Sequence, residues 1–329
     1  MTKPIFYINS SALSVKSTCS LRLRYTICDG FNQDIGRFND IHFGTCFHLY
    51  MQTLAQTKGD HTAALTKAIE CWNKKLPELI VKATKKHIDL VFLANTIQQF
   101  KSTYSRSGKA DWWDNIENFH YYRSQDDVPF VEQKLVLPYF TSDAFDLVIV
   151  GTIDALGWIG DSLCLLDFKT TSSWDVDEFF GKYEVSNQML LYTWMLNYFA
   201  KTEPNKLIGS IFNKHPAFGC SIFGIFHKKG EVNFRRSPII YFPEHRIQKF
   251  EEALAVKLGS IVQLCSLYVK NPSRKQYDGL VNGTCKMYGA AECPYTVACT
   301  STRDEDEEAV LEAKYGRTPY NPLATHEDI

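Results

Sequence analysis

The most constraining feature of this chain is a pair of strand-like segments joined at Gly160-Asp161. Glycine at the first central position of a two-residue loop suits a type II′ turn, so the pattern predicts a β-hairpin. With that loop, paired residue numbers sum to 321, and Asp154 lies directly opposite Asp167. Lys169, two residues after Asp167, then points to the same side of the sheet. The sequence therefore gathers two carboxylates and one lysine on one face.

These three charges lie in a hairpin whose other residues are mainly apolar. Directly opposed side chains are about 5 Å apart at Cβ, and two carboxylates that close repel each other in an apolar sheet. A divalent cation between Asp154 and Asp167 removes the repulsion, and Mg²⁺ favours one or two carboxylates with water and phosphate oxygens. Lys169 can then orient or deprotonate a water, or neutralise charge during attack on a phosphodiester. The simpler alternative is a buried hairpin with a cross-strand salt bridge between Lys169 and one aspartate.

Five short motifs follow one another between residues 44 and 192. They are Gly44-Thr45-Cys46-Phe47-His48, Val131-Glu132, Gly151-Thr152-Ile153-Asp154, Asp167-Phe168-Lys169-Thr170-Thr171 and Gln188-Met189-Leu190-Leu191-Tyr192. In this order the motifs resemble those of the RecB-like branch of the PD-(D/E)XK nucleases, which includes the CRISPR-adaptation exonucleases and many phage recombination nucleases. Gln188 and Tyr192 are four residues apart and share a helix face, which suits two polar groups aimed at one bound strand.

The resemblance implies both a fold and a metal site. The implied fold is α/β, with a restriction-endonuclease-like core in which helices flank a mixed central sheet. In the implied site, Asp154 and Asp167 bind Mg²⁺ or Mn²⁺. His48 and the backbone carbonyl of Phe168 complete the ligand set.

The other motif residues take supporting roles by the same resemblance. Glu132 would be an auxiliary acid, Lys169 would position the attacking water, and Gln188 and Tyr192 would hold the substrate strand. We therefore predict a metal-dependent DNA exonuclease that acts on single-stranded ends in phage or prokaryotic replication, recombination or repair. A helicase or a recombination protein is the expected protein partner. A structure-selective or restriction-type endonuclease would use the same residues, and a non-catalytic nucleic-acid-binding subunit is the third alternative.

A second constellation lies near the end of the chain. Cys285, Cys293 and Cys299 are one ligand short of a tetrahedral four-cysteine site. The segment resembles RecB-like nucleases in which one N-terminal cysteine joins three C-terminal ones around a [4Fe–4S] cluster, which implies Cys19 as the fourth ligand, with Cys28 as its rival. The spacing departs from the commonest one, because seven residues separate Cys285 from Cys293. A zinc site and free thiols are the alternatives.

Periodicity and turn signals predict the order of helices and strands. Helices are expected at about 44–57, 62–80 and 85–105, in a segment ending near Phe199, and at about 243–270. Strands are expected at 129–140, in the hairpin at 145–170, and at about 206–213, 220–227 and 231–242.

The same pattern predicts how the chain is divided. Because the proposed cluster ligands lie at opposite ends, we expect one nuclease domain over residues 1–299, with the cluster joining the chain ends. Within it, about 60–128 would form a helical insertion and 285–299 the cysteine segment. The acidic tail at 300–329 is expected to be mobile, with a partner-binding helix as the alternative.

Composition and charge narrow the setting. The N-terminus shows no charged-then-apolar leader, and no apolar run approaches the roughly 18 residues that span a membrane. We therefore expect a cytoplasmic, reducing setting without membrane contact. The net charge of −1 gives no bulk attraction to DNA, so a local basic groove is expected. Candidate cations are Lys16, Arg22, Arg24, Lys228, Lys229, Arg235, Arg236, Arg246 and Lys249. The aromatic segment at 112–122 would either stack bases or pack in the core.

Overall fold

The chain forms two compact units in this computed structural model. Unit 1 comprises Met1–Ile35, Leu135–Gly151 and Glu244–Leu323, and unit 2 comprises Gly36–Lys134, Thr152–Pro243 and Ala324–Ile329. The structure describes residues 3–16, 19–31, 38–76, 88–108, 111–173, 175–228, 231–272, 293, 295–299, 304–315, 317, 320 and 323.

Unit 2 contains the predicted hairpin and most of the sheet. Its hydrogen-bonded strand order is β4-β5-β6-β7, where β4–β5 and β6–β7 are antiparallel and β5–β6 is parallel. The strands are β2 (Phe119–Tyr121), which pairs with β4, the end of β4 (Asp146–Ile159), β5 (Ser162–Thr171), β6 (Gly219–Lys228) and β7 (Glu231–Arg236).

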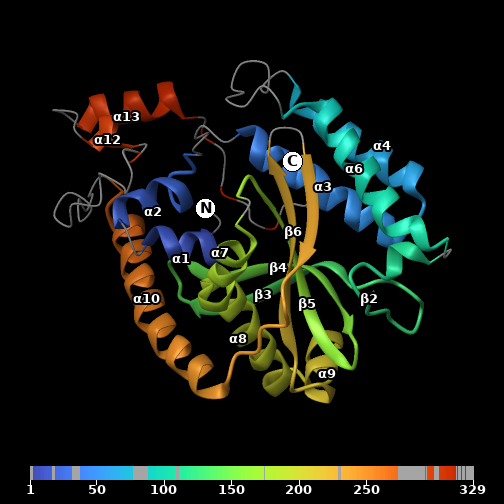
Figure 1. The fold of residues 1–329 in the computed structure, drawn as a ribbon. Coiled ribbons are helices and arrows are strands. Elements are labelled where there is room, and N and C mark those ends of the chain that lie inside the picture. The colour runs from blue at the N-terminus through green and yellow to red at the C-terminus, as the bar shows by residue number, and fades with distance from the viewer. Residues whose placement is uncertain are drawn as a thin grey trace. The chain divides into compact units, whose positions relative to one another are not determined.

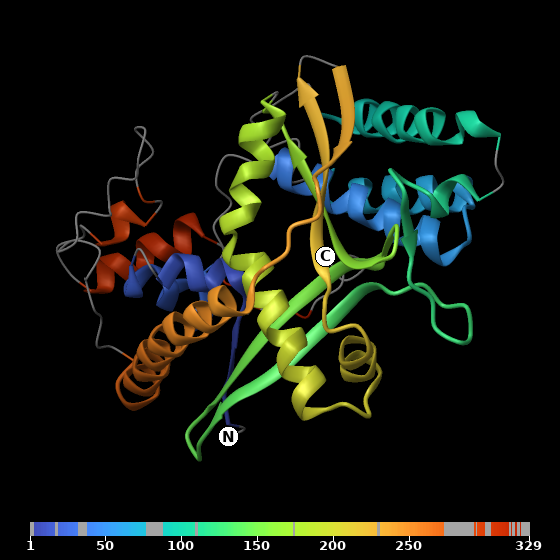
Figure 2. The ribbon, with the colours of Figure 1, turned by 60° about the horizontal axis from the view of Figure 1, so that its bottom comes forward.

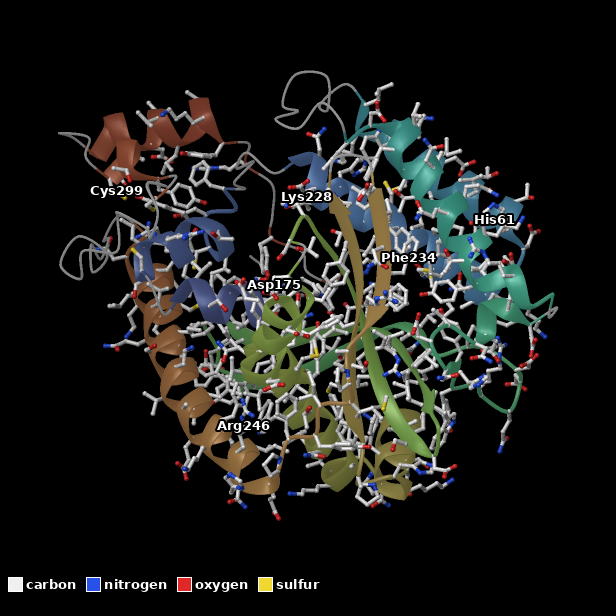
Figure 3. All side chains as sticks on the ribbon, in the orientation of Figure 1. His61, Asp175, Lys228, Phe234, Arg246 and Cys299 are labelled. Atoms are coloured by element: carbon white, nitrogen blue, oxygen red, sulfur yellow. The ribbon has the colours of Figure 1, made fainter. Side chains whose placement is uncertain are left out.

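Helices cover both faces of this sheet in Figures 1 and 2. On one side are α3 (Phe38–Gln56), α4 (His61–Lys74) and α6 (Leu90–Tyr104), and the crossover from β5 to β6 supplies the other side. Phe234 of β7, labelled in Figure 3, packs against Phe100 of α6 with 5.4 Å between ring centroids. The crossover contains α7 (Val176–Gly181), η3 (Lys182–Val185), α8 (Asn187–Thr202) and α9 (Leu207–Lys214). A mixed sheet flanked by helices confirms the predicted fold class.

Unit 1 draws on both ends of the chain. Strand β1 (Ile5–Ile8) runs parallel to the start of β4, from Asp146 to Ile149, and β3 (Val131–Thr141) also pairs with β4. The helices are α1 (Ser10–Lys16), α2 (Ser20–Ile27), α10 (Glu244–Lys270), α12 (Thr296–Cys299) and α13 (Asp304–Lys314). Figure 3 labels Cys299 at the end of α12.

The hairpin register agrees with the sequence. Every described pair between β4 and β5, from Ala155–Leu166 to Ile159–Ser162, has residue numbers that sum to 321. Gly160 has φ +59°, a left-handed conformation that the turn needs and that side chains disfavour. Ala155–Leu166 is the pair next to Asp154 and Asp167, so the register predicted for the two carboxylates is confirmed up to their immediate neighbours.

Two strand predictions were wrong. Residues 206–213 form helix α9, because Leu207, Ile208, Ile211 and Phe212 recur at helical spacing and a short apolar run does not distinguish strand from helix. The strand predicted at 231–242 ends at Arg236. Pro238 has no N–H to donate to a ladder, and beyond it only the isolated bridge between Ile240 and Cys220 is described.

The acidic tail, for which mobility stays a prediction, contains a helix. Residues 304–314 form α13, and Leu311 on this helix is buried in an apolar cluster with Tyr25 and Tyr295. The buried leucine therefore anchors the described part of the tail within unit 1. The other tail residues lie mostly outside the described part of the chain.

Helix α10 bears on the prediction that no segment is long enough to span a membrane. Within the described residues, it is the one helix whose length and composition would permit it to span a membrane. In its most apolar window, 28% of the residues are buried. Leu254, Leu258, Ile261 and Leu264 form a buried stripe at helical spacing. Core helices of globular proteins meet the same criterion, so α10 is weak support for a membrane segment.

Candidate active site

Seven side chains singled out in the sequence come together in unit 2. Two adjacent strands provide the centre, with Asp154 on β4 and Asp167 and Lys169 on β5. Asp167 is buried and lies on a central strand, with β4 on one side of β5 and β6 on the other. The remaining four come from neighbouring elements: His48 on α3, Glu132 on β3, and Gln188 and Tyr192 on α8.

His48 reaches the sheet because helix α3 passes close to β5. A Cβ atom at Gly44 would lie 3.3 Å from the Thr170 hydroxyl oxygen, so glycine permits this approach. One turn later, His48 Nε2 lies 2.8 Å from the Phe168 carbonyl oxygen. A carbonyl only accepts, so Nε2 donates this hydrogen bond. His48 Nδ1 then faces two carboxylates, 3.4 Å from Asp154 Oδ2 and 3.9 Å from Glu132 Oε1.

The Asp154 carboxylate is held between strand and helix. Its Oδ2 accepts the Phe168 backbone N–H at 2.8 Å. Burial raises the pKa of Asp154 to about 7; the nearby Asp167 carboxylate adds to the rise and His48 opposes it. For His48, burial disfavours the charged form, but Asp154 and Glu132 outweigh burial and raise its pKa to about 9. Without a metal ion, a proton on His48 Nδ1 is therefore the counter-charge to these carboxylates, and it must leave for Nδ1 to bind a metal.

Lys169 provides the counter-charge on the other side. Its Nζ lies 2.8 Å and 2.7 Å from the two carboxylate oxygens of Asp167. Burial alone would lower the pKa of Lys169, but Asp167 and Asp154 together raise it. The Gln188 amide donates to Asp167 Oδ1 at 3.0 Å and to the Tyr192 hydroxyl at 3.0 Å. The Gln188 amide therefore links the Asp167 carboxylate to Tyr192, one turn further along α8.

The placement of Gln188 follows from the way α8 begins. The Ser186 hydroxyl caps the helix by accepting the Gln188 backbone N–H at 3.2 Å. Gln188 is thereby in the first turn, where its side chain reaches β5. Tyr192 lies one turn further along and shares that face.

Glu132 has an unusual backbone conformation. Its φ is +49°, in the left-handed region that non-glycine residues seldom adopt. Such a conformation costs about 1–3 kcal/mol and persists where the surrounding structure imposes it. The strain occurs on strand β3, at the residue whose carboxylate faces His48.

Comparison with known protein families identifies this arrangement. The sequence profile of the PD-(D/E)XK nuclease superfamily matches residues 7–300. The chain belongs to this superfamily. It is therefore a nuclease, a hydrolase that binds nucleic acid, and PD-(D/E)XK nucleases use divalent ions such as Mg²⁺ or Mn²⁺. The family predicted from the motifs is confirmed. Among curated proteins, none matches the chain.

The donor set in this PD-(D/E)XK nuclease fits a hard divalent ion. Ligand atoms of His48, Glu132 and Asp154 all lie within 4.8 Å of one another. Carboxylate oxygens, a backbone carbonyl and a single imidazole suit Mg²⁺ or Mn²⁺ better than thiophilic metals. Lys169 balances Asp167 on β5, and beside Asp154 a bound ion would replace the proton on His48 Nδ1, since a ligating imidazole must be neutral.

Tyr183 belongs to the same environment, although no sequence motif contains it. It lies on η3, and burial raises its pKa to about 12; Lys169 lowers the pKa and Asp167 raises it. Both site charges are therefore within electrostatic reach of the phenol. Its ring packs on Phe179, with 5.4 Å between centroids. The one feature of the sequence that could have indicated Tyr183 is its position five residues before Gln188, just ahead of α8.

Three of the four cysteines predicted to bind the cluster are among the described residues of unit 1. Cys19, Cys293 and Cys299 all pack against one apolar cluster that includes Tyr25 and Tyr295. Cys285 lies outside the described residues. Burial raises the pKa of Tyr315, and Cys293 and Cys299 add to the rise, so both thiols are near this phenol.

The rival ligand Cys28 has a different partner. A hydrogen bond with the thiol of Cys265 on α10 raises the pKa of Cys28, and burial adds to the rise. This pairing favours Cys19 over Cys28 as the N-terminal member of the proposed cluster.

Several side chains proposed for DNA contact have internal roles. Trp112, Trp113, Phe119 and Tyr121 are buried, which supports the core-packing alternative for the aromatic segment. Arg236 donates to the backbone carbonyls of Glu117 and Ser237. Arg24 is buried and paired with Asp29. These two arginines therefore have internal contacts that stabilise the fold. The other lysines and arginines proposed from the sequence stay candidates for a basic groove.

Proposed function

We propose that this nuclease is a metal-dependent DNA exonuclease that acts on single-stranded ends. Metal-dependent hydrolysis is supported by the cluster of Asp154, Asp167 and Lys169 on two adjacent strands, with His48 hydrogen-bonded to the Phe168 carbonyl. The preference for single-stranded ends rests on the resemblance of the motifs to RecB-like exonucleases. A non-catalytic subunit would have no need to hold two carboxylates and a lysine together in a buried position, because buried charge is costly. The intact charge set supports hydrolysis.

The chemistry can be assigned to the residues of the site. A divalent ion held by Asp154, Asp167, His48 and the Phe168 carbonyl would polarise the scissile phosphate and favour loss of a proton from the attacking water. Glu132 would serve as an auxiliary acid at the same ion. The proximity of ligand atoms from His48, Glu132 and Asp154 supports these assignments, and Asp167 is added by its motif.

Lys169 would act beside the metal ligands. It has two contacts with Asp167, so its ammonium is fixed in position and can orient the water or stabilise charge developing on the phosphate. Gln188 and Tyr192 would hold the substrate strand, since their hydrogen bond places both polar groups on one helix face. Tyr183 is a further candidate for contact with that strand.

The same residues serve an exonuclease and an endonuclease, so the site does not distinguish the two. The requirement for a free DNA end does. We expect linear single-stranded DNA to be degraded in Mn²⁺ while circular single-stranded DNA of the same sequence survives. Lys169→Ala protein, prepared identically, controls for contaminating nucleases. Cutting of circles at a rate comparable to that of linear strands, absent from the Lys169→Ala preparation, would replace the proposal with the endonuclease alternative. Inactivity on both forms would favour the non-catalytic subunit.

We also propose that Cys19, Cys285, Cys293 and Cys299 hold a [4Fe–4S] cluster. The support is that the three described cysteines pack against one cluster of unit 1, and four thiolates suit either iron–sulfur or zinc. Protein purified without oxygen should be brown, with about four irons per chain. Colourless protein with one zinc bound by four sulfurs would instead support a four-cysteine zinc site.

The setting of this activity follows from the same residues. In the described part of the chain the cysteines form no disulfide, which suits a reducing, cytoplasmic location. Single-stranded DNA is the proposed substrate, and a helicase or recombination protein that exposes such strands is the proposed partner. Replication, recombination or repair in a phage or prokaryote would provide both.

A further inference from the structure

Helices α3 and α4 enclose a second group of metal-ligating side chains. His42 and Cys46 lie on α3, Cys71 lies on α4, and their exposed fractions are 6%, 0% and 4%. The imidazole nitrogen and the two sulfurs all lie within 4.8 Å of one another. We propose that these three side chains form a structural zinc site, distinct from the carboxylate site and independent of the nuclease assignment.

The spacing of the donor atoms fits one tetrahedral ion. With Zn–S near 2.3 Å and Zn–N near 2.1 Å, a sulfur and a nitrogen on the same zinc are about 3.5 Å apart. Cys46 Sγ lies 3.7 Å from His42 Nε2. The two residues are four apart on α3, so they share a face, and α4 brings Cys71 to it. A side-chain contact between Cys46 and Cys71 raises the pKa of Cys46, which places the two sulfurs together.

The fourth position has a backbone candidate. His42 Nε2 also lies 3.3 Å from the carbonyl oxygen of Trp72. A nitrogen and an oxygen bound to one tetrahedral zinc are about 3.3 Å apart, given Zn–O distances near 2.0–2.2 Å. In the metal-free protein Nε2 donates to this carbonyl. Zinc would bind the Nε2 lone pair of the other neutral tautomer, with the proton on Nδ1.

Charge and softness both select zinc. Two thiolates and a neutral imidazole are soft donors, which disfavour Mg²⁺, Ca²⁺ and Mn²⁺. Two thiolates cancel the charge of Zn²⁺, whereas Cu⁺ would leave a net negative charge in a site packed among apolar side chains, where unbalanced charge is costly. On binding, two Zn–S bonds and one Zn–N bond form, both thiol protons leave to solvent, and no electron is transferred.

The consequence is a covalent-strength link between two helices. The ion would tie α3 to α4 through His42 and Cys46, which lie on either side of Gly44 and before His48. Because α3 also carries His48, the zinc would help to fix the helix from which that imidazole reaches β5. Its role is structural, so the ion itself touches no substrate.

Metal analysis of the full chain tests the site. Wild-type protein and the Cys71→Ala, His42→Gln and Cys164→Ala variants are purified from zinc-supplemented medium without chelators, and zinc per chain is measured by plasma mass spectrometry. Cys164 is a matched control, because it is a fully buried thiol on β5. We expect about one zinc fewer per chain in Cys71→Ala and in His42→Gln than in wild type, and no loss in Cys164→Ala. Equal zinc in wild type and Cys71→Ala would overturn the proposal.

X-ray absorption at the zinc edge of wild-type protein keeps the test decisive if variants fail to fold. The proposed site predicts two sulfurs near 2.3 Å with two nitrogen or oxygen neighbours near 2.1 Å. Four sulfur neighbours would assign the zinc to the four-cysteine segment and refute the α3–α4 site. Wild-type protein that holds no zinc after reconstitution would also refute it, leaving the three side chains as core packing only.

Discussion

The carboxylate site of unit 2 and the cysteine segment of unit 1 gather their functional groups in different ways. In unit 2, hairpin register places Asp154 beside Asp167, and neighbouring elements add the rest. In unit 1, Cys19 and Cys293 come from opposite ends of the chain and meet only through a shared apolar cluster. Local geometry therefore suffices for Asp154, Asp167 and Lys169. The second group depends on how distant segments pack, and it should be the one whose loss unfolds the protein.

The largest effect expected is loss of cleavage when the hairpin charges are removed. Asp154→Ala, Asp167→Ala and Lys169→Ala should each lower the cleavage rate by about 10³-fold or more, because several kcal/mol of transition-state stabilisation is lost. DNA binding should persist, since phosphate contacts elsewhere remain. Cleavage assays and filter binding measure the two separately. Asp161→Ala, at the exposed turn of the same hairpin, is the control, and near wild-type turnover in Asp167→Ala would remove the active-site assignment.

Substitution in the cysteine segment should affect folding more than cleavage chemistry. Cys293→Ala should lose its iron and give several-fold less folded protein, because metal ligation contributes directly to folding. Iron analysis and gel filtration of the soluble fraction measure both effects. Cys164→Ala, which removes a buried thiol from β5, should keep its iron. If Cys293→Ala loses iron but folds and melts like wild type, the contrast between the two regions fails, because unit 1 would not need the cluster.

Two glycine-to-alanine variants, one in each unit, test the same comparison with smaller expected effects on turnover. Alanine at Gly44 places a Cβ 3.3 Å from the Thr170 hydroxyl, so either the Thr170 side chain or α3 must shift by a few tenths of an ångström, and a shift of α3 moves His48 with it. We expect turnover to fall about tenfold, since small displacements in an active site are costly. At Gly259 on α10, a Cβ would meet nothing within 4 Å.

Gly259→Ala is therefore the matched control. It should stabilise the protein by about 0.5–1 kcal/mol through helix propensity and leave turnover unchanged. Thermal melting and steady-state kinetics on both variants measure the difference. Equal turnover in Gly44→Ala and wild type would show that the close approach of α3 to β5 does not matter for the site.

The smallest effect expected is a pH dependence in unit 1. Burial raises the pKa of Glu307 from 4.5 to about 7, with Arg24 opposing the rise, and the Tyr25 hydroxyl donates to this carboxyl group. The folded state therefore holds this proton more tightly than the unfolded state. The resulting stability is present below pH 4.5 and is lost as pH rises towards 7.

Replacing Glu307 with glutamine isolates this contribution. The variant keeps an oxygen for Tyr25 but no longer titrates, so Glu307→Gln should melt above wild type at pH 8 and lose that advantage at pH 5. Melting curves across this range measure the difference between the two proteins. A difference that does not change with pH would contradict the buried, protonated carboxyl.

Much of the site could be predicted because it repeats simple periods. A two-residue turn and a period of two place Asp154, Asp167 and Lys169, and a spacing of four places Gln188 with Tyr192. Helix α9 shows the limit. Its apolar residues recur at helical spacing, but the run is only eight residues long, and so short an apolar run is easily taken for a strand.

Other features had no local signal. The left-handed backbone of Glu132 is imposed by its surroundings, because nothing in Val131-Glu132 favours a positive φ. Tyr183 joins the site only through the path of the crossover. The pairing of Cys28 with Cys265, and of His42 and Cys46 with Cys71, required helices to be placed side by side.

By itself, the sequence determined the hairpin, its register and the family, because turn chemistry and side-chain alternation act over a few residues. The tertiary structure alone decided which cysteines share an environment, how α3 delivers His48 to Phe168, and that part of the acidic tail is anchored by Leu311. These outcomes depend on burial of apolar surface between segments far apart in the chain. That burial is a property of the whole packed unit, and no short window of residues contains it.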